Sequence, residues 1–330
     1  MPRITAAALL LLAAQFLLPI ALIRGEPLVG RDTGEPAALL PIHRMAAETS
    51  GEQDGAKQVR LLLEDGSVQT MSLSDYLWGV VAAEMPASFE LEALKAQAVA
   101  ARTYWAASGG KHEQADLCED SGCCQAYISR TEAAANWGSK TDAYTARMEQ
   151  AVKQTDGLVV TYEGKPIQAL FFSTAPGSTV DARAVWGQAV PYLVSVASPE
   201  GEEVPNYHSQ LTMTTQEFRT LVMERYPGAD LSGPVSGWLS NFVWEPSGTV
   251  NTVSLGGVTL TGGQVRSLLG LRSACFSVSV SGDQMTFHVT GYGHGVGMSQ
   301  YGANTMAAQG KSFTDILTWY YTGAKVELLD

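Results

Sequence analysis

The sequence predicts an α+β fold, a β-rich body in which helices form a substrate cleft. Segments with the two-residue alternation of strands and segments with helical spacing follow one another without regular βαβ alternation. Of the 330 residues, 45% are hydrophobic and only 16% are charged, which excludes a disordered chain and a multi-span membrane protein. The length is sufficient for one large domain or two small ones with a substantial core.

The charge balance excludes one class of partner. The chain has 21 basic and 33 acidic residues, so its formal net charge is -12. Proteins that bind nucleic acid by neutralising phosphates normally present a basic face or stripe. We therefore expect no nucleic-acid partner.

The first 24 residues predict a membrane anchor. The run from Ile4 to Ile23 carries no charge and lies between Arg3 and Arg24, and an apolar helix needs ~20 residues to span a bilayer. The alternative is a cleaved signal peptide, but no small-x-small cleavage site directly follows the run. We expect one uncleaved N-terminal transmembrane helix at the cell membrane, with the rest of the chain outside the cytoplasm.

Residues 25–57 are rich in Pro, Gly and acidic residues without periodicity, which predicts an extracytoplasmic linker. Residues 58–330 then form the folded domain. Its expected elements are a hairpin at 59–73, a helix at 88–105, a hairpin at 158–172, a helix at 215–226, and a β-rich stretch at 243–290 with a short helix at 264–269.

The segment Ala83-Glu84-Met85-Pro86 holds the first candidate for chemistry. Apolar neighbours remove solvation from a charged carboxyl group, so the pKa of Glu84 is expected to rise toward the range of a general acid. Pro86 stiffens the turn before the next helix and so holds Glu84 in place. The alternative is a partly exposed carboxylate with no catalytic role. Near the end of that helix, the residue types of Arg102 and Tyr104 favour purely structural roles, at the negative end of the helix dipole and in the core.

A cysteine-rich loop predicts a metal site. His112, Cys118, Cys123 and Cys124 have the spacing H-x5-C-x4-C-C. Thiolates and an imidazole on a flexible loop are the donors of a closed tetrahedral zinc site. Outside the cytoplasm the alternative is a disulfide from Cys118 to Cys123 or Cys124, which leaves one thiol over. His112 and the odd number of loop cysteines favour zinc.

A glycine-rich segment from Gly291 to Ala303 lies between a predicted strand and a predicted helix. Its glycines allow the backbone to approach a ligand closely, and four residues supply hydrogen-bonding groups: His294, Ser299, Gln300 and Tyr301. A binding loop and a tight structural turn are both compatible with this pattern. A dinucleotide fingerprint is not, because Met298 stands where that fingerprint needs glycine.

Ser173 begins a second small polar loop, 173–179, which Trp186 follows shortly along the chain. Hydroxyl groups near an aromatic ring suit a carbohydrate ligand, although an ordinary surface turn has the same composition. No G-x-S-x-G surrounds Ser173, which argues against a serine-hydrolase nucleophile.

Two motifs together resemble the stage II sporulation protein D (SpoIID) family. They are EMP at 84–86 followed by LKAQAVAARTY at 94–104, and GHGVGMSQYGA at 293–303. The resemblance covers about residues 59–326. It implies a membrane-anchored lytic transglycosylase that cleaves peptidoglycan glycan strands stripped of their stem peptides, during engulfment in sporulation. It also implies that a sporulation cell-wall amidase and a membrane scaffold protein act beside it.

The resemblance assigns roles to particular residues. Glu84 matches the catalytic acid/base, and Arg102 and Tyr104 match residues that line the cleft. The glycan-binding loop matches the four polar residues of the glycine-rich segment: His294, Ser299, Gln300 and Tyr301. These four residues, together with Arg102, Tyr104 and Ser173, are the expected substrate-binding residues. At 175–177 the chain has Ala-Pro-Gly where the family commonly has Ser-Gly-Gly, so the contacts of Ser173 depend less on the resemblance.

Some members of the family resemble this chain in having a zinc loop, usually with two histidines and two cysteines. Here Cys123 stands in place of one histidine, so a structural Cys3His site is expected and the disulfide alternative stays open. The main functional alternative is a non-catalytic peptidoglycan-binding module that enhances a cell-wall amidase. A secreted zinc hydrolase is disfavoured, because four protein ligands leave no position for a catalytic water.

Overall fold

A computed structural model of the chain describes residues 52–108 and 110–329. The predicted anchor at residues 1–24 and most of the predicted linker at residues 25–57 lie outside this part of the chain. Among the residues that the structure describes, no helix is long and apolar enough to cross a membrane.

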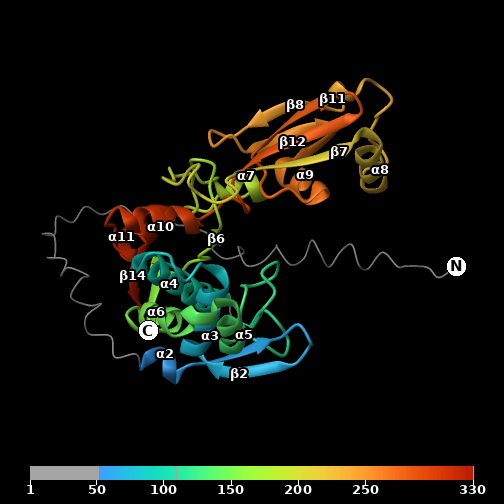
Figure 1. Ribbon diagram of the computed structural model, residues 1–330. Helices are drawn as coiled ribbons and strands as arrows, with labels where there is room; N and C mark the ends of the chain where they lie inside the picture. The colour runs from blue at the N-terminus through green and yellow to red at the C-terminus, as the bar shows by residue number, and fades with distance from the viewer. Residues whose placement is uncertain (1–51, 109, 330) are drawn as a thin grey trace, which may run out of the picture. The chain divides into compact units, whose positions relative to one another are not determined.

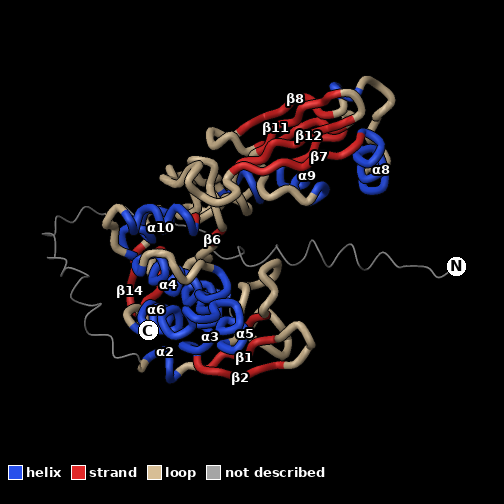
Figure 2. Tube along the Cα trace, viewed as in Figure 1, coloured by secondary structure: helices blue, strands red, loops and turns tan. Residues whose placement is uncertain are grey.

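The described chain is a mixed α+β body, as the sequence predicts (Figure 1), and its helices and strands follow one another irregularly (Figure 2). The helices are α2 (Gln53–Ala56), α3 (Leu73–Glu84), α4 (Leu91–Ser108), α5 (Arg130–Trp137), α6 (Thr141–Lys153), α7 (Ala182–Trp186), α8 (Thr215–Arg225), α9 (Gly262–Leu269), α10 (Gln300–Ala308) and α11 (Phe313–Tyr320). The strands are β1 (Gln58–Leu62), β2 (Val68–Ser72), β3 (Leu117–Cys118), β4 (Leu158–Tyr162), β5 (Lys165–Pro166), β6 (Phe171–Phe172), β7 (His208–Thr214), β8 (Leu239–Trp244), β9 (Val250–Leu255), β10 (Val258–Thr261), β11 (Phe276–Ser281), β12 (Gln284–Thr290), β13 (Met298–Ser299) and β14 (Lys325–Leu328).

Helix α4 lies at the centre of the larger hydrophobic core. Its leucines and alanines have the helical spacing that predicts a buried stripe, and the helix packs against α3, α6, α10, α11 and β4. Glu84 is the last residue of α3, and Gln300 is the first residue of α10. Because both helices pack on α4, the end of one and the start of the other come together.

A second hydrophobic core is built from α8, α9 and the strands from β7 to β12. Strand β12 pairs antiparallel with β11 and β7, and β9 pairs antiparallel with β10 and β8. Thr261 begins α9 with a capping box, and Gly270 ends it in the left-handed conformation. The predicted β-rich stretch at 243–290 with one short helix is confirmed.

The predicted hairpins differ in outcome. The hairpin at 59–73 is confirmed, because β1 pairs antiparallel with β2 from Gln58 opposite Ser72 to Leu62 opposite Val68. The prediction of a hairpin at 158–172 is confirmed only for its first part, where β4 pairs antiparallel with β5. Pro166 has no N–H to continue the ladder, and the chain leaves the sheet until β6 pairs in parallel with β13. The free edge of β4 pairs antiparallel with β14.

The folded body begins earlier than the sequence indicates. Residues Gln53–Ala56 are already helical, and Asp54 is 1% exposed. We expected linker as far as residue 57, so this boundary is wrong by several residues. Composition does not reveal the error, because Asp54 is fixed by Arg102, a partner far along the chain.

Candidate functional site

Glu84 is half-buried at the end of α3 and is held by two donors. Its Oε1 accepts a hydrogen bond from the Ala126 N–H at 2.9 Å, and its Oε2 accepts one from Nε2 of Gln300 at 3.4 Å. Burial raises the pKa of Glu84, and the two donors oppose this rise without cancelling it. The carboxyl group is therefore fixed in place and binds a proton more tightly than a free glutamate does.

Two glutamines extend this site, and sequence reasoning found only one of them. Nε2 of Gln300, whose side chain is almost buried, also lies 3.5 Å from Oε1 of Gln97. Gln97 is fully buried in α4, and its own Nε2 has no hydrogen-bond partner among the described residues. A lone glutamine between alanines on the buried stripe of a helix is a signal that could have identified it.

Arg102 lies inside the protein rather than on a substrate surface. Its Nε donates to Oδ1 of Asp54 at 2.9 Å, its Nη2 to Oδ2 at 2.5 Å, and its Nη1 to the Leu158 carbonyl at 3.0 Å. This bidentate ion pair ties α4 to α2 and β4. The expectation that Arg102 contacts a glycan is therefore corrected, because the guanidinium has no exposed surface.

Tyr104 lies one helical turn from the end of α4 and faces the cysteine loop. Its hydroxyl donates to the Cys123 carbonyl at 3.4 Å and accepts from Nζ of Lys111 at 3.2 Å. The ring is 8% exposed. In this position Tyr104 supports the loop and presents little surface to a ligand.

The four predicted metal ligands come together in one cluster. The donor atoms of His112, Cys118, Cys123 and Cys124 all lie within 4.8 Å of one another. Nε2 of His112 is 3.4 Å from Sγ of Cys124 and 3.8 Å from Sγ of Cys123, and these two sulfurs are 3.9 Å apart. Sulfur donors placed tetrahedrally at about 2.3 Å from a zinc ion are about 3.8 Å apart. The donor set and its spacing therefore fit a closed zinc site.

The cysteines of this cluster are free thiols in the structure. Burial raises the pKa of Cys124 to about 12 although the charge of Lys111 lowers it, and a metal ion bound to the sulfur would favour the thiolate. Two residues after Cys124, the backbone N–H of Ala126 donates to Glu84. The conformation of the cysteine loop thus sets one of the two hydrogen bonds that hold Glu84.

Ser299 is fully buried and holds the start of α10. Its Oγ accepts from the Gly302 N–H as the N-cap and donates to Oε1 of Glu200. Glu200, which sequence reasoning missed, is 4% exposed and also accepts from the Ala175 N–H and from Oγ of Ser198. Ser299 thus fixes the first turn of α10, which places Gln300 beside Glu84. Because its hydroxyl is buried, the expectation that Ser299 contacts a glycan is corrected.

His294 uses both ring nitrogens within the glycine-rich loop. Its Nε2–H donates to the Phe171 carbonyl at 3.1 Å, and its Nδ1 accepts from the Val296 N–H at 3.2 Å. Burial, together with the nearby charge of Arg266, lowers the pKa of His294 to about 4. The ring is therefore neutral at neutral pH and holds the loop, rather than offering a free nitrogen to a ligand.

Trp186, 43% exposed, lies against the His294 ring with the ring centroids 5.9 Å apart.

Tyr301 and Ser173 are joined through the backbone and both keep some exposed surface. The Tyr301 N–H donates to the Ser173 carbonyl at 3.0 Å, and the Tyr301 ring packs edge-on against Phe89 at 4.9 Å. Oγ of Ser173 lies 3.2 Å from Oγ1 of Thr174. The structure thus brings Ser173 and Tyr301 together at the start of α10, and Gln300 of the same helix contacts Glu84.

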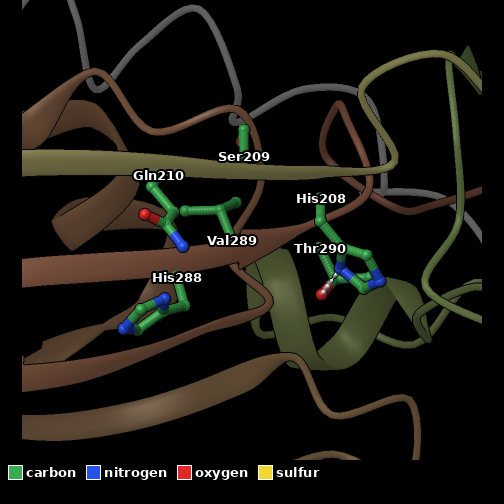
Figure 3. Close-up of a pocket in the computed structure, with 6 residues that line it drawn as sticks. All are labelled: His208, Ser209, Gln210, His288, Val289 and Thr290. Carbon is green, nitrogen blue, oxygen red and sulfur yellow. Dashed lines mark hydrogen bonds between the residues drawn. The ribbon is translucent and has the colours of Figure 1, made fainter.

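An open pocket of about 400 Å³ lies on the second core and not at Glu84 (Figure 3). It is lined by His208, Ser209, Gln210, His288, Val289 and Thr290 of β7 and β12. A smaller pocket of about 250 Å³ lies beside Trp319 of α11. Neither is lined by a residue that the sequence singled out, so the substrate cleft at Glu84 stays a prediction.

Comparison with known proteins places this arrangement among sporulation proteins. Residues 64–162 match the family model described as stage II sporulation protein (SpoIID). The chain is 40% identical to stage II sporulation protein D of Bacillus subtilis (strain 168) over 269 residues, which are 80% of this chain and 77% of the relative. It is 37% identical to the protein of the same name from Bacillus amyloliquefaciens over 327 residues, 98% of this chain and 93% of the relative. It is also 29% identical to the amidase enhancer of Bacillus subtilis (strain 168), over 75% of this chain and 39% of that protein.

Proposed function

The chain belongs to the stage II sporulation protein D (SpoIID) family, and from this premise we propose that it is a lytic transglycosylase that cleaves peptidoglycan glycan strands. The proposed substrates are strands without stem peptides, cut during engulfment in sporulation. The uncharged run within residues 1–24 would hold the enzyme at the cell membrane, with the catalytic domain outside the cytoplasm. A sporulation cell-wall amidase and a membrane scaffold protein are its proposed partners, and the similarity to an amidase enhancer supports the first of these.

The observation that carries this proposal is the environment of Glu84. A general acid must hold its proton near working pH and must keep a fixed direction toward the leaving oxygen. Burial raises the pKa of Glu84, and hydrogen bonds from Ala126 and Gln300 fix both of its oxygens. These are the two requirements of a general acid in one side chain.

The proposed reaction needs only this one carboxyl group. Glu84 protonates the oxygen of the glycosidic bond as that bond to C1 of muramic acid breaks. The 6-hydroxyl of the same muramic acid then forms a new bond to C1 and gives its proton to the Glu84 carboxylate, which leaves a 1,6-anhydro end. Hydrolytic glycosidases generally need a second carboxylate to act on C1 or on water. Among the described residues, the two hydrogen-bond partners of Glu84 are a backbone N–H and a glutamine amide, and neither is a carboxyl group.

Zinc is the proposed structural cofactor. His112, Cys118, Cys123 and Cys124 would hold it, and a closed site of this kind stabilises a loop without taking part in the reaction. Metal analysis of the purified chain tests this proposal: we expect one zinc per chain, and loss of the metal in Cys124→Ser. A metal-free chain with two fewer titratable thiols than the sequence contains would instead establish the disulfide.

The decisive experiment is mass spectrometry of the products from glycan strands without stem peptides. The intact chain is expected to release saccharides with anhydro ends, and Glu84→Gln is expected to release none while keeping the fold. Glu90→Gln is the matched control, because Glu90 is an exposed glutamate six residues further along. Full activity of Glu84→Gln would exclude Glu84 as the acid/base.

The alternative function is enhancement of a cell-wall amidase without cleavage of glycan, and one relative carries that name. The same experiment separates the two functions. If neither the wild type nor Glu84→Gln releases anhydro ends, but both increase the output of an added amidase, the chain is an enhancer.

A further inference from the structure

Two arginines beside the glycine-rich loop have no acidic partner within residues 52–108 and 110–329. Arg266 belongs to α9, Arg272 follows that helix closely, and both are half-buried. No ion pair of the described chain includes either of them. A partly buried cation without a counter-ion is unfavourable for the folded state.

Arg272 is held firmly although its charge is unpaired. Its guanidinium carbon lies 3.9 Å from the centre of the Tyr292 ring, and its Nε is buried without a hydrogen-bond partner in the described chain. Its carbonyl oxygen accepts from the Gly293 N–H at 2.9 Å and from Nε of Arg266 at 3.2 Å. The backbone of Arg272 is thus fixed to the loop, and the guanidinium is stacked on a ring that is itself 43% exposed.

Arg266 adds a second positive charge at the same place. Its Nε donates to the carbonyls of Leu271 and Arg272, each at 3.2 Å, which uses one of its five N–H groups. Burial lowers the pKa of Arg266, and the charge of Arg266 contributes to the lowered pKa of His294 in the loop. The loop that delivers Gln300 to Glu84 is therefore flanked by a positive site that no side chain of the described region neutralises.

We propose that Arg272, supported by Arg266, binds a free carboxylate on the glycan strand, namely the lactyl carboxylate of muramic acid. A planar guanidinium matches a carboxylate with two parallel hydrogen bonds. The exposed face of Tyr292 lies beside it as an apolar surface for a sugar ring. This inference rests on the proposed function, because it assumes that the ligand of the loop is a peptidoglycan strand.

This contact would account for the preference for strands without stem peptides that is already part of the proposed function. While a stem peptide is attached, the lactyl group is a neutral amide and offers no charge to Arg272. Hydrolysis of that amide bond adds water, releases the peptide and creates the carboxylate. The reaction that supplies the preferred substrate is therefore an amide hydrolysis, and the arginine pair distinguishes its product from its substrate.

The test compares binding of two ligands that differ at the lactyl group, which is a charged carboxylate in one and a neutral methylamide in the other. The ligands are glycan strands without stem peptides, and the same strands after their lactyl carboxylates have been coupled to methylamine. Binding is measured by calorimetry with the intact chain carrying Glu84→Gln, so that the strands are not cut. We expect the acid form to bind roughly ten- to a hundredfold more tightly than the amide form, and the difference to shrink at high salt.

Arg272→Gln should abolish this preference by weakening binding of the acid form while leaving the amide form unchanged. Arg225→Gln is the matched control, an exposed arginine of α8. Equal affinity of the acid and amide forms for the unsubstituted site, or equal weakening of both by Arg272→Gln, would overturn the inference. Failure of the proposed function is a separate result: it would appear as carboxylate-selective binding by a wild-type chain that releases no anhydro ends.

Discussion

Two arginines of this protein, Arg102 and Arg272, lie in opposite electrostatic situations. Arg102 is fully buried and donates to both carboxylate oxygens of Asp54 and to the Leu158 carbonyl. Arg272 is half-buried and no ion pair of the described chain includes it. Removing one partner of a buried ion pair leaves the other charge buried and uncompensated, which destabilises the fold. A charged side chain that has no partner of opposite charge within the fold is a candidate for binding a charged ligand.

Two glutamates show the same contrast. Glu200 is almost completely buried and accepts from the Ala175 N–H, from Ser198 and from Ser299. Glu84 has two donors, one of them at 3.4 Å, and its pKa is raised because burial outweighs them. Substitutions of the fully paired groups should therefore reduce the free energy of unfolding, and substitutions of the underpaired groups should reduce activity or binding instead.

The largest effect on stability is expected at Arg102. Arg102→Met leaves the buried Asp54 carboxylate unpaired, which should lower the free energy of unfolding by about 3–5 kcal/mol. Arg60→Met is the matched control, because Arg60 pairs with Asp116 at the surface and its side chain is 51% exposed; its loss should be about 0–1 kcal/mol. Urea unfolding measures the free energy of unfolding of both variants. Similar losses in the two would contradict the prediction that the buried ion pair matters more than the surface pair.

The next effect is a dependence on pH that comes from His294. Its pKa is about 4 in the folded protein and 6.5 when unperturbed, so below pH 6.5 the unfolded chain binds a proton that the folded chain does not. Between pH 7 and pH 5 this should lower the stability by about 2 kcal/mol. Thermal unfolding of wild type and His294→Gln across this range checks it. An equally steep fall in the variant would assign the pH dependence to other groups.

A smaller loss is expected at Ser299. Ser299→Ala removes the N-cap of α10 and one donor to the buried Glu200 carboxylate, so the free energy of unfolding should fall by about 1–2 kcal/mol. Because the first turn of α10 positions Gln300, activity should fall as well. Ser312→Ala, at the N-cap of α11, is the control: it should lose stability without losing activity.

The smallest change in stability is expected at Glu84. Its pKa is raised, so the folded chain binds a proton more readily than the unfolded chain, and stability contributed by protonated Glu84 is lost as pH rises through the folded pKa. At pH 7, Glu84→Gln should therefore be as stable as the wild type or slightly more stable, although the proposed function predicts that it is inactive. A clear loss of stability in this variant would show that Glu84 has a structural role like that of Glu200, and would contradict the difference proposed between the two glutamates.

The sequence alone predicted the elements that depend on local pattern. The apolar period of α4, the hairpin of β1 and β2, and the helices α8 and α9 follow from residues close together in the chain. The four ligands of the cysteine loop are also local, because they span only thirteen residues, from His112 to Cys124. The family motifs identified Glu84 and Gln300, which the packing of α3 and α10 on α4 brings to 3.4 Å.

Tertiary structure decided the roles of the polar residues within those motifs. Arg102, His294 and Ser299 stand in the same motifs as Glu84 and Gln300, yet their hydrogen-bonding groups are taken up by partners distant in sequence: Asp54, Phe171 and Glu200. Gln97 and Arg272 are in the opposite situation, because each has a buried polar atom without a hydrogen-bond partner in the described chain. This makes them candidates for contact with a ligand. Whether a polar group is satisfied depends on contacts between distant segments, and no local pattern of residue types contains that information.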